Sequence, residues 1–257
     1  MENASDSYSA CPSGMNTNEW RARVDLAALY RLVALEGWDD LIFTHISYRL
    51  PGPEHHFLLN PFGALFGEIT ASSLVKIDRE GNPVEDAGAL VNPAGFVIHG
   101  AIHMARDDAR CVVHLHTVDG AALSARREGL LPLTQHAMII GEEVAYHDYE
   151  GVVLDMDERE RLVANLGSKH LMILRNHGTL AVAPNCGGAW LLIYYLERAC
   201  SMQLRAVAGD GAVVQPNQGV AQRVRGQSNA WFDGTGGAYA WPAFLRKLDR
   251  IDSGYRF

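Results

Sequence analysis

The sequence of 257 residues lacks several features that would assign a function at once. No apolar run approaches the roughly 18 to 20 residues that a membrane helix needs. No P-loop and no GxGxxG motif occurs, so the glycine loops that bind nucleotide phosphates are absent. Basic runs are absent too and the net charge is −8, which argues against nucleic acid and anionic membranes as partners. The expected ligand is a small molecule.

Cysteine is also scarce. The four cysteines show neither the paired spacing of a zinc knuckle nor a redox CxxC: Cys11, Cys111, Cys186 and Cys200. We therefore expect unpaired thiols in a reducing compartment. The N-terminus lacks the basic start and apolar stretch of a secretion signal, which favours a cytoplasmic protein.

The length and composition predict one α/β domain with a large core. Residues 1–18 are small and polar and predict a disordered lead-in. Residues 19–208 carry the regular patterns and form the expected domain. In residues 209–257 the composition shifts to Gly, Gln and Val, which predicts a tail packed on the body or on a neighbouring subunit.

Helical spacing and period-two alternation predict the order of elements. A first helix is expected over 20–36, capped by Asn18 and ended by Gly37. Short alternating runs between 44 and 84 predict antiparallel strands, and Asn92-Pro93 a helix start. Further helices are expected at 118–127, 157–166, 187–207 (capped by Asn185) and 242–248. Further strands are expected at 111–116, 138–140, 144–146, 171–174 and 179–183.

Two histidines in CVVHLH are the first candidates for chemistry. His114 and His116 are two apart on a predicted strand, so both side chains project from one face. That geometry lets two nitrogens reach one ion about 2 Å away. An HxH pair at a strand end is more often structural than metal-binding, because backbone carbonyls can satisfy two neutral histidines, and both interpretations stay open on the pair alone.

A third histidine stands at the tip of a predicted hairpin. His177 precedes Gly178, a residue that allows a sharp turn able to aim a side chain at a neighbouring strand. An ordinary exposed turn histidine is the alternative. Three neutral imidazoles would leave a divalent ion its full charge and open positions, which is typical of a catalytic site that polarises carbonyls.

Longer segments resemble the class II aldolase/adducin family, closest to its adducin-related bacterial branch. They are IHGAIHMARDDARCVVHLHT, RNHGTLAVA, DDLIFTHISYRL and FLLNPFGALFGEITASSLVKID, and the resemblance extends over roughly residues 29–206. It implies a central, largely antiparallel sheet flanked by helices. It also implies one divalent metal ion (Zn, Fe(II), Mn or Co) on the three histidines, and a homotetramer with active sites at subunit interfaces.

The sequence departs from the family's pattern at two places. The catalytic glutamate falls on Gly95, and the loss of a positioned acid or base typically costs about 10² to 10⁴ in rate. The serines before it fall on Pro93 and Ala94, and the Asn of the family's GNxSxR motif on His45. Classical sugar-phosphate aldolase activity is therefore not expected, and the pocket should take a less anionic oxo- or hydroxy-acid.

The same alignment assigns the remaining candidates. His45, Ser47 and Gly95 are expected to line the substrate pocket, and Arg49 to meet a substrate carboxylate. His99, one helical turn after Gly95, is the catalytic candidate, as an orienting group or proton carrier. A packed core histidine is the alternative for His99.

Three functions fit these observations. The first is a metal-dependent lyase that breaks a C–C bond next to a carbonyl, by retro-aldol cleavage or decarboxylation. The second is an iron(II) oxygenase of aromatic oxo- or hydroxy-acids, since three histidines leave room for a chelating substrate and O₂. The third is a non-catalytic, adducin-like assembly module, which retention of all three histidines disfavours.

Overall fold

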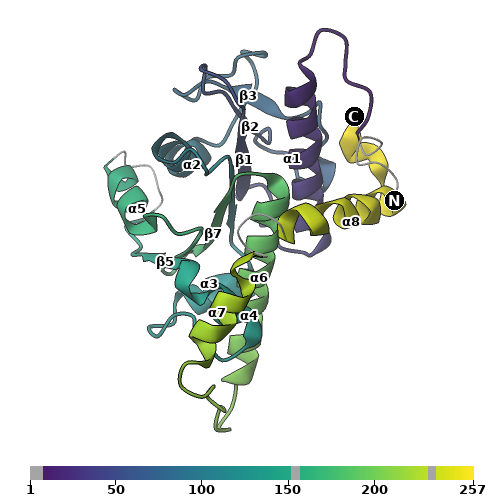
Figure 1. The fold of residues 1–257 in the computed structure, drawn as a ribbon. Helices are drawn as coiled ribbons and strands as arrows, with labels where there is room; N and C mark the ends of the chain where they lie inside the picture. The colour runs from purple at the N-terminus through teal and green to yellow at the C-terminus, as the bar shows by residue number, and fades with distance from the viewer. Residues whose placement is uncertain (1–7, 152–156, 231–235) are drawn as a thin grey trace.

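The computed structural model describes residues 8–151, 157–230 and 236–257 (Figure 1). Its strands are β1 (His45–Arg49), β2 (Phe57–Leu59), β3 (Val75–Ile77), β4 (Cys111–Leu115), β5 (Val144–His147), β6 (Leu171–Leu174) and β7 (Gly178–Ala183). Its α-helices are α1 (Thr17–Leu35), α2 (Pro93–Ala105), α3 (Val118–Ser124), α4 (Gln135–Ile140), α5 (Glu158–Leu166), α6 (Cys186–Ala206), α7 (Val220–Ala230) and α8 (Gly236–Ile251). Short 3₁₀ turns are η2 (Phe66–Glu68), η3 (Gly141–Glu143) and η5 (Ser253–Arg256).

The strands form one seven-stranded sheet in the order β3-β2-β1-β4-β7-β6-β5. Neighbouring strands are antiparallel except β5 and β6, which run parallel. The expectation of an α/β fold around a largely antiparallel sheet is confirmed. The predicted hairpin of β6 and β7 is also present, with Leu174 opposite Gly178.

The two faces of the sheet are covered by different helices. Helices α1 and α6 contact the sheet on one face, whereas α2 contacts β1 and packs with α5 on the other (Figure 1). Successive residues of β4 follow this division. Val113 belongs to the large core with α1 and α6, and Val112 to a smaller core with Ile98 of α2 and Leu162 of α5. His114 therefore lies on the α2 face, because side chains alternate along a strand.

Caps explain where the long helices begin and end. Asn16, two residues before the expected Asn18, caps α1 by accepting from the backbone N–H groups of Asn18 and Glu19. Gly37 follows α1 with φ 68°, as expected of a residue that ends a helix. Asn185 caps α6 as predicted.

One predicted strand is wrong. Met138 to Ile140 belong to α4, which Thr134 caps through the backbone N–H of Ala137. Such a short apolar run does not separate strand from buried helix by periodicity, and a side-chain cap favours the helix here. Helix α7 was not predicted, and α8 is longer than the expected 242–248.

The first described residues and the last helices pack on the body. Tyr8 donates a hydrogen bond to Asp25 of α1, and Ser9 donates to the backbone carbonyl of Arg256. Helix α8 contacts α6, and α7 contacts α4. The domain limits at 18/19 and 208/209 stay predictions. Within the described residues, no helix combines the length and apolar character of a membrane span.

Candidate metal centre

The structure brings the three predicted ligands together. His114 is the penultimate residue of β4, His116 directly follows the strand, and His177 lies at the tip between β6 and β7. The Nε2 atom of His116 is 2.9 Å from Nε2 of His114 and 2.9 Å from Nε2 of His177. Among the described residues these three histidines form the cluster able to hold an ion.

Strand register explains why they meet. Leu115, the last residue of β4, pairs with Thr179 near the start of β7, so the end of β4 faces the hairpin tip. The tip residue in the left-handed region is Asn176, with φ 55°, rather than the expected Gly178. Gly178 serves another purpose, because a Cβ there would overlap the carbonyl oxygen of Leu115. Glycine permits the close approach of the two strands that carry the ligands.

Hydrogen bonds fix the protons of two ligand rings. Nδ1 of His114 lies 3.0 Å from the carbonyl oxygen of Thr179, and Nδ1 of His116 lies 3.1 Å from Oδ2 of Asp40. Carbonyl and carboxylate oxygens only accept, so each Nδ1 carries the hydrogen of a neutral ring. The Nε2 atoms of His114 and His116 then present unshared electron pairs to each other at 2.9 Å.

This donor set fits a metal ion. Facing lone pairs repel, and a cation between them removes the repulsion, while the Nδ1 bonds hold the rings as ligating histidines are usually held. Two nitrogens on one tetrahedral zinc ion stand about 3.3 to 3.4 Å apart. The observed spacing needs only a small expansion to admit such an ion.

Burial keeps two of the ligand rings neutral. It is the largest cause that lowers the pKa of His114 well below its usual value, with the nearby His177 second. Burial, followed by His116, lowers the pKa of His177 to about 4. Neutral imidazole is the form that binds a metal, so the cluster is available as a ligand set at neutral pH.

A buried glutamate holds the two ligand-bearing segments from behind. Glu197 of α6 is 3% exposed and accepts hydrogen bonds from the hydroxyls of Thr117 and Thr179. Thr117 follows His116, and the carbonyl of Thr179 accepts from His114. Burial raises the pKa of Glu197 to about 7. Sequence reasoning missed Glu197, because a single acid in an apolar helix gives no local sign of its partners.

Three further histidines lie in a chain on the same face of the sheet. Nδ1 of His103 donates to the carbonyl of Ala109 at 2.7 Å, which leaves its Nε2 to accept from the Ser47 hydroxyl at 2.6 Å. Ser47 in turn accepts from Nδ1 of His99 at 2.6 Å, and Nε2 of His99 accepts from Nδ1 of His45 at 2.9 Å. One carbonyl thus sets the direction of every bond. Burial lowers the pKa of His45 and His103 to about 3.

This chain fixes where the other predicted residues lie. The His45 ring is 5.2 Å from the His114 ring, whereas His99 bonds to His45 and Ser47. His99 therefore reaches the centre through His45, and its catalytic role stays a prediction. The side chains of residues 93–97 lie outside the described part of the structure, so a role of Gly95 in substrate binding stays a prediction as well.

Arg49 is held at the end of α2. Its guanidinium donates to the backbone carbonyl oxygens of His103 at 2.7 Å and of Asp107 at 2.8 Å. The last carbonyls of a helix lack partners within the helix and carry partial negative charge, which explains why a cation is held at the end of α2. Arg49 is 8% exposed and is held there, and its contact with a substrate carboxylate stays a prediction.

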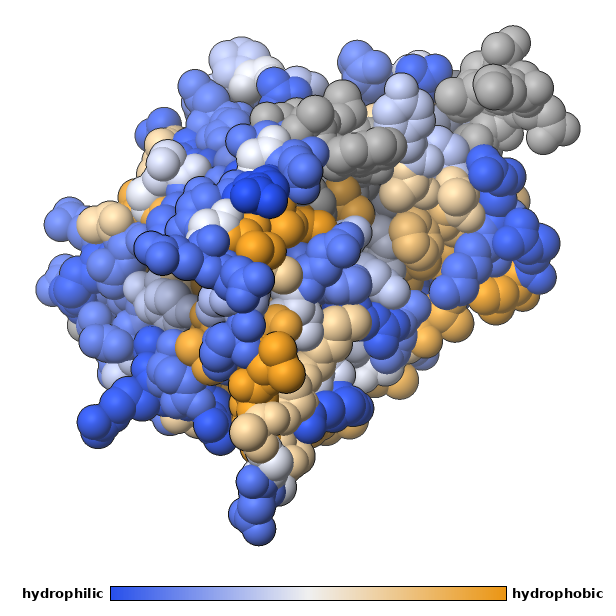
Figure 2. Space-filling view, turned by 60° about the horizontal axis from the view of Figure 1, so that its bottom comes forward, coloured by the Kyte–Doolittle hydropathy of each residue, from blue (hydrophilic) through white to orange (hydrophobic). Residues whose placement is uncertain are grey.

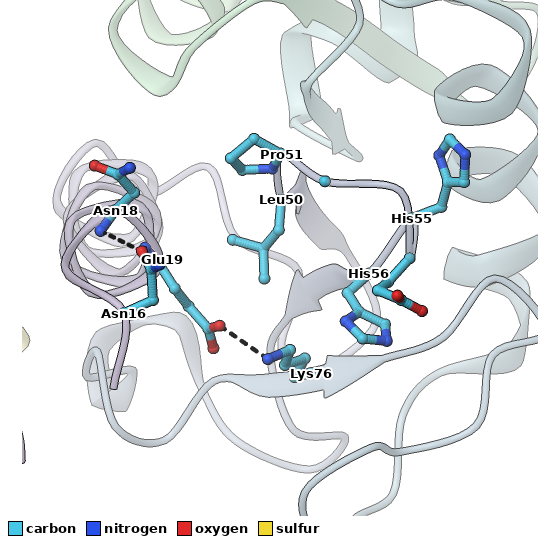
Figure 3. A pocket seen from close by; sticks show the side chains of 10 residues that line it. Asn16, Asn18, Glu19, Leu50, Pro51, His55, His56 and Lys76 are labelled. Carbon is cyan, nitrogen blue, oxygen red and sulfur yellow. Dashed lines mark hydrogen bonds and ion pairs between the residues drawn. The ribbon is translucent and has the colours of Figure 1, made fainter. Parts of the chain in front are cut away.

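A separate hollow of about 240 Å³ opens between the start of α1 and the segment from Leu50 to His56 (Figure 3). The ion pair of Glu19 and Lys76, 2.8 Å long, lies at its edge. None of the predicted site residues lines it. Its lining includes His55 and His56.

The structure thus combines a seven-stranded sheet with a cluster of three histidines that could hold a metal ion. Comparison with known families matches residues 24–204 to the Class II Aldolase and Adducin N-terminal domain. The chain belongs to this family.

Individual relatives include both kinds of protein in that family. A predicted class 2 aldolase of Caulobacter vibrioides is 58% identical over 238 residues, which cover 92% of each chain. Alpha-adducin of Rattus norvegicus is 42% identical over 250 residues, which cover 91% of this chain and 33% of the adducin. The chain thus spans a third of that adducin.

Solved structures agree with the fold. An aldolase II superfamily protein from Pseudomonas syringae superposes with a TM-score of 0.91 at 50% identity, over 95% of this chain and 98% of the other. An L-fuculose 1-phosphate aldolase from Glaciozyma antarctica PI12 superposes with a TM-score of 0.83 at 27% identity, over 98% of both chains.

Proposed function

We propose that this chain is a divalent-metal-dependent lyase that cleaves a C–C bond next to a carbonyl in a small, non-phosphorylated oxo- or hydroxy-acid. The observation that carries the proposal is the convergence of the Nε2 atoms of three histidines at the tip of the β6–β7 hairpin. A bound ion at such a site polarises a carbonyl and stabilises the negative charge that develops as the bond breaks. His114, His116 and His177 would hold it.

The surrounding residues hold the three ligand histidines in position through hydrogen bonds. Asp40 and the carbonyl of Thr179 orient two rings, and Glu197 holds Thr117 and Thr179 in place. Hydrogen-bonded supports of this kind fix the ring orientation and strengthen binding of the metal. The site is therefore organised before any ion or substrate arrives.

The cluster contains histidine ligands and no carboxylate among the described residues. A family glutamate at Gly95 would have supplied both a ligand and a proton acceptor. Decarboxylation fits this donor set better than retro-aldol cleavage, because no proton has to be removed before the C–C bond breaks. His45, whose ring lies beside that of His114, is the nearest remaining candidate for contact with substrate.

Elemental analysis of anaerobically purified protein tests the metal directly. We expect near-stoichiometric zinc, manganese or cobalt in the wild type and its loss, with loss of turnover, in His114→Ala/His116→Ala. The matched control is His55→Ala/His56→Ala, which removes two histidines that line a different hollow. That control should keep its metal.

Other results would redirect the proposal. Turnover that survives chelation would exclude metal catalysis. Near-stoichiometric iron with oxygen uptake would contradict the lyase and assign an oxygenase. Protein without metal, folded and stable, would leave an adducin-like assembly role, which the identity with alpha-adducin makes the second candidate.

We also propose a cytoplasmic homotetramer with active sites at subunit interfaces. All four cysteines are unpaired, which suits a reducing compartment. Apolar residues gather among hydrophilic ones on the face shown in Figure 2. Large apolar side chains exposed beside the ligand-bearing segments include Leu41 at 65% and Val118 at 86%. Exposed apolar area of this kind is typical of protein contact surfaces.

A further inference from the structure

A hollow of about 530 Å³ adjoins the hairpin tip that carries His177. Its lining comes from the end of α3, the loop after β5 and the hairpin tip: Ser124, Ala125, Arg126, Arg127, Asp148, Tyr149, Arg175 and Asn176. Three of these eight side chains are arginines and one is a carboxylate. The lining is thus predominantly cationic in a protein whose net charge is −8.

Residues that line the hollow lie next to the metal ligand His177. Asn176 directly precedes His177, and the backbone N–H of His177 donates to the hydroxyl of Ser124 at 3.1 Å. The ring of Tyr149 lies 5.9 Å from the ring of His177. Residues of the hollow therefore flank one of the three ligands on two sides, which places the cationic lining beside the metal centre.

The arginines differ in what already holds them. Arg126 forms an ion pair with Glu128 at 2.5 Å. Arg175 donates to the carbonyl of Arg126 at 2.7 Å and lies over the Tyr146 ring, 4.4 Å from its centroid. Within the described residues, Arg127 and Arg175 form no ion pair with a carboxylate. Their charges are available to an anionic ligand, against the carboxylates of Asp148 in the lining and of Glu128 beside it, which is paired with Arg126.

We infer that this hollow binds a second carboxylate of the substrate, at the end remote from the metal, between Arg127 and Arg175. The inference rests on the proposed function and narrows its substrate class to oxo-dicarboxylic acids. The planar guanidinium group matches a carboxylate through two parallel hydrogen bonds. These two arginines are more accessible to a ligand than Arg49, which is 8% exposed and held by two backbone carbonyls.

Binding to cobalt-loaded protein tests the inference with two acids of equal chain length. 2-Oxoglutarate carries the second carboxylate and 2-oxopentanoate lacks it, and both are titrated while the absorption of the bound cobalt is followed. We expect 2-oxoglutarate to bind about tenfold more tightly, as one charge-assisted arginine–carboxylate hydrogen bond provides. The difference should shrink as salt rises, since the hollow is open to solvent.

Variants assign the effect to residues. Arg127→Gln should remove most of the tenfold preference while the affinity for cobalt and for 2-oxopentanoate stays unchanged. Arg127→Lys should restore part of it, and Arg175→Lys should reduce it without removing the contact with Tyr146. Arg79→Gln is the control, because Arg79 is 61% exposed, paired with Glu80 and absent from the hollow.

The outcomes separate this inference from the proposal on which it rests. Equal binding of the two acids, or a preference that survives Arg127→Gln, would refute the assignment of the hollow to a second carboxylate. Either result would leave the proposal of a metal-dependent lyase unaffected. A failure of both acids to perturb the bound cobalt would overturn the proposed substrate class and the inference with it. Tighter binding of the phosphonate of equal length, 2-oxo-4-phosphonobutanoate, would assign the hollow to phosphate instead of carboxylate.

Discussion

Replacing Gly178 by alanine is the smallest change that should separate the metal ligands. The added methyl would overlap the carbonyl oxygen of Leu115 and lie 3.2 Å from Cδ2 of His116 and 3.3 Å from the Leu115 carbonyl carbon. The first obstacle is backbone, so strands β4 and β7 must move apart locally by roughly 1 Å to reach an ordinary contact distance. Overpacking of this kind costs about 1 to 3 kcal/mol.

The same displacement should weaken the metal site. Ligand distances tolerate only about 0.2 Å of error, so a shift of the hairpin tip moves His177 out of reach of an ion held by the other two histidines. We expect cobalt affinity to fall at least about tenfold, which corresponds to about 1.4 kcal/mol. Cobalt titration by absorbance and urea unfolding of the metal-free protein measure the two effects separately.

A matched control distinguishes this cause from a general effect of the substitution. Gly226 lies inside α7 with nothing within 4 Å of an added Cβ, so Gly226→Ala should keep cobalt affinity and raise stability slightly. If Gly178→Ala unfolded more easily yet bound cobalt as tightly as the wild type, the three histidines would not act as one ligand set. Unchanged stability would refute the steric argument itself.

Two further predictions concern pH. The first concerns Glu197, whose pKa is raised from 4.5 to about 7 in the folded protein. The folded state therefore binds the proton more tightly than the unfolded state, and this stabilises the fold below pH 4.5 by an amount on the order of 3 kcal/mol. The stabilisation is lost as the pH rises towards 7. Because the histidine shifts described next act over the same pH range, the test by urea unfolding is the difference in unfolding free energy between the wild type and Glu197→Gln, which should become smaller from pH 5 to pH 8. The pKa values of His45 and His103, lowered to about 3, act oppositely. Their stabilisation is complete above pH 6.5 and disappears as the pH falls towards 3, so the wild type should unfold in acid, and a urea midpoint that is constant from pH 7 to 4 would contradict this.

Alternation along strands made much of the site predictable. His114 and His116 share a face because they are two apart, and His99 and His103 share one because they are four apart on a helix. Neither pattern reveals that β1 and α2 bring Ser47 between His99 and His103, since that depends on how distant segments pack. The sequence therefore indicated the candidates, and the tertiary packing determined their partners.

Contacts made by residues distant in the sequence could not be predicted from the local sequence pattern. Asp40 orients His116 from 76 positions earlier in the chain, within a short segment where Leu41 has φ 51°. Arg49 was expected at the substrate, yet the unsatisfied carbonyls at the end of α2 compete for it more closely. The same limit applies to α4, where a cap from Thr134 decides a structure that apolar character leaves open.

The two histidine groups on the α2 face differ in a way that explains why we propose the metal ion at the outer group, His114, His116 and His177, and not at the inner one. In the inner group both nitrogens of His99 and of His103 are used, because each Nδ1 donates to an acceptor and each Nε2 accepts from a donor. A metal ion there would have to displace a hydrogen bond at every ligand. In the outer group the Nδ1 atoms of His114 and His116 are used and their Nε2 lone pairs face one another. The chain thus satisfies one set of imidazoles internally and leaves the other set to a cation.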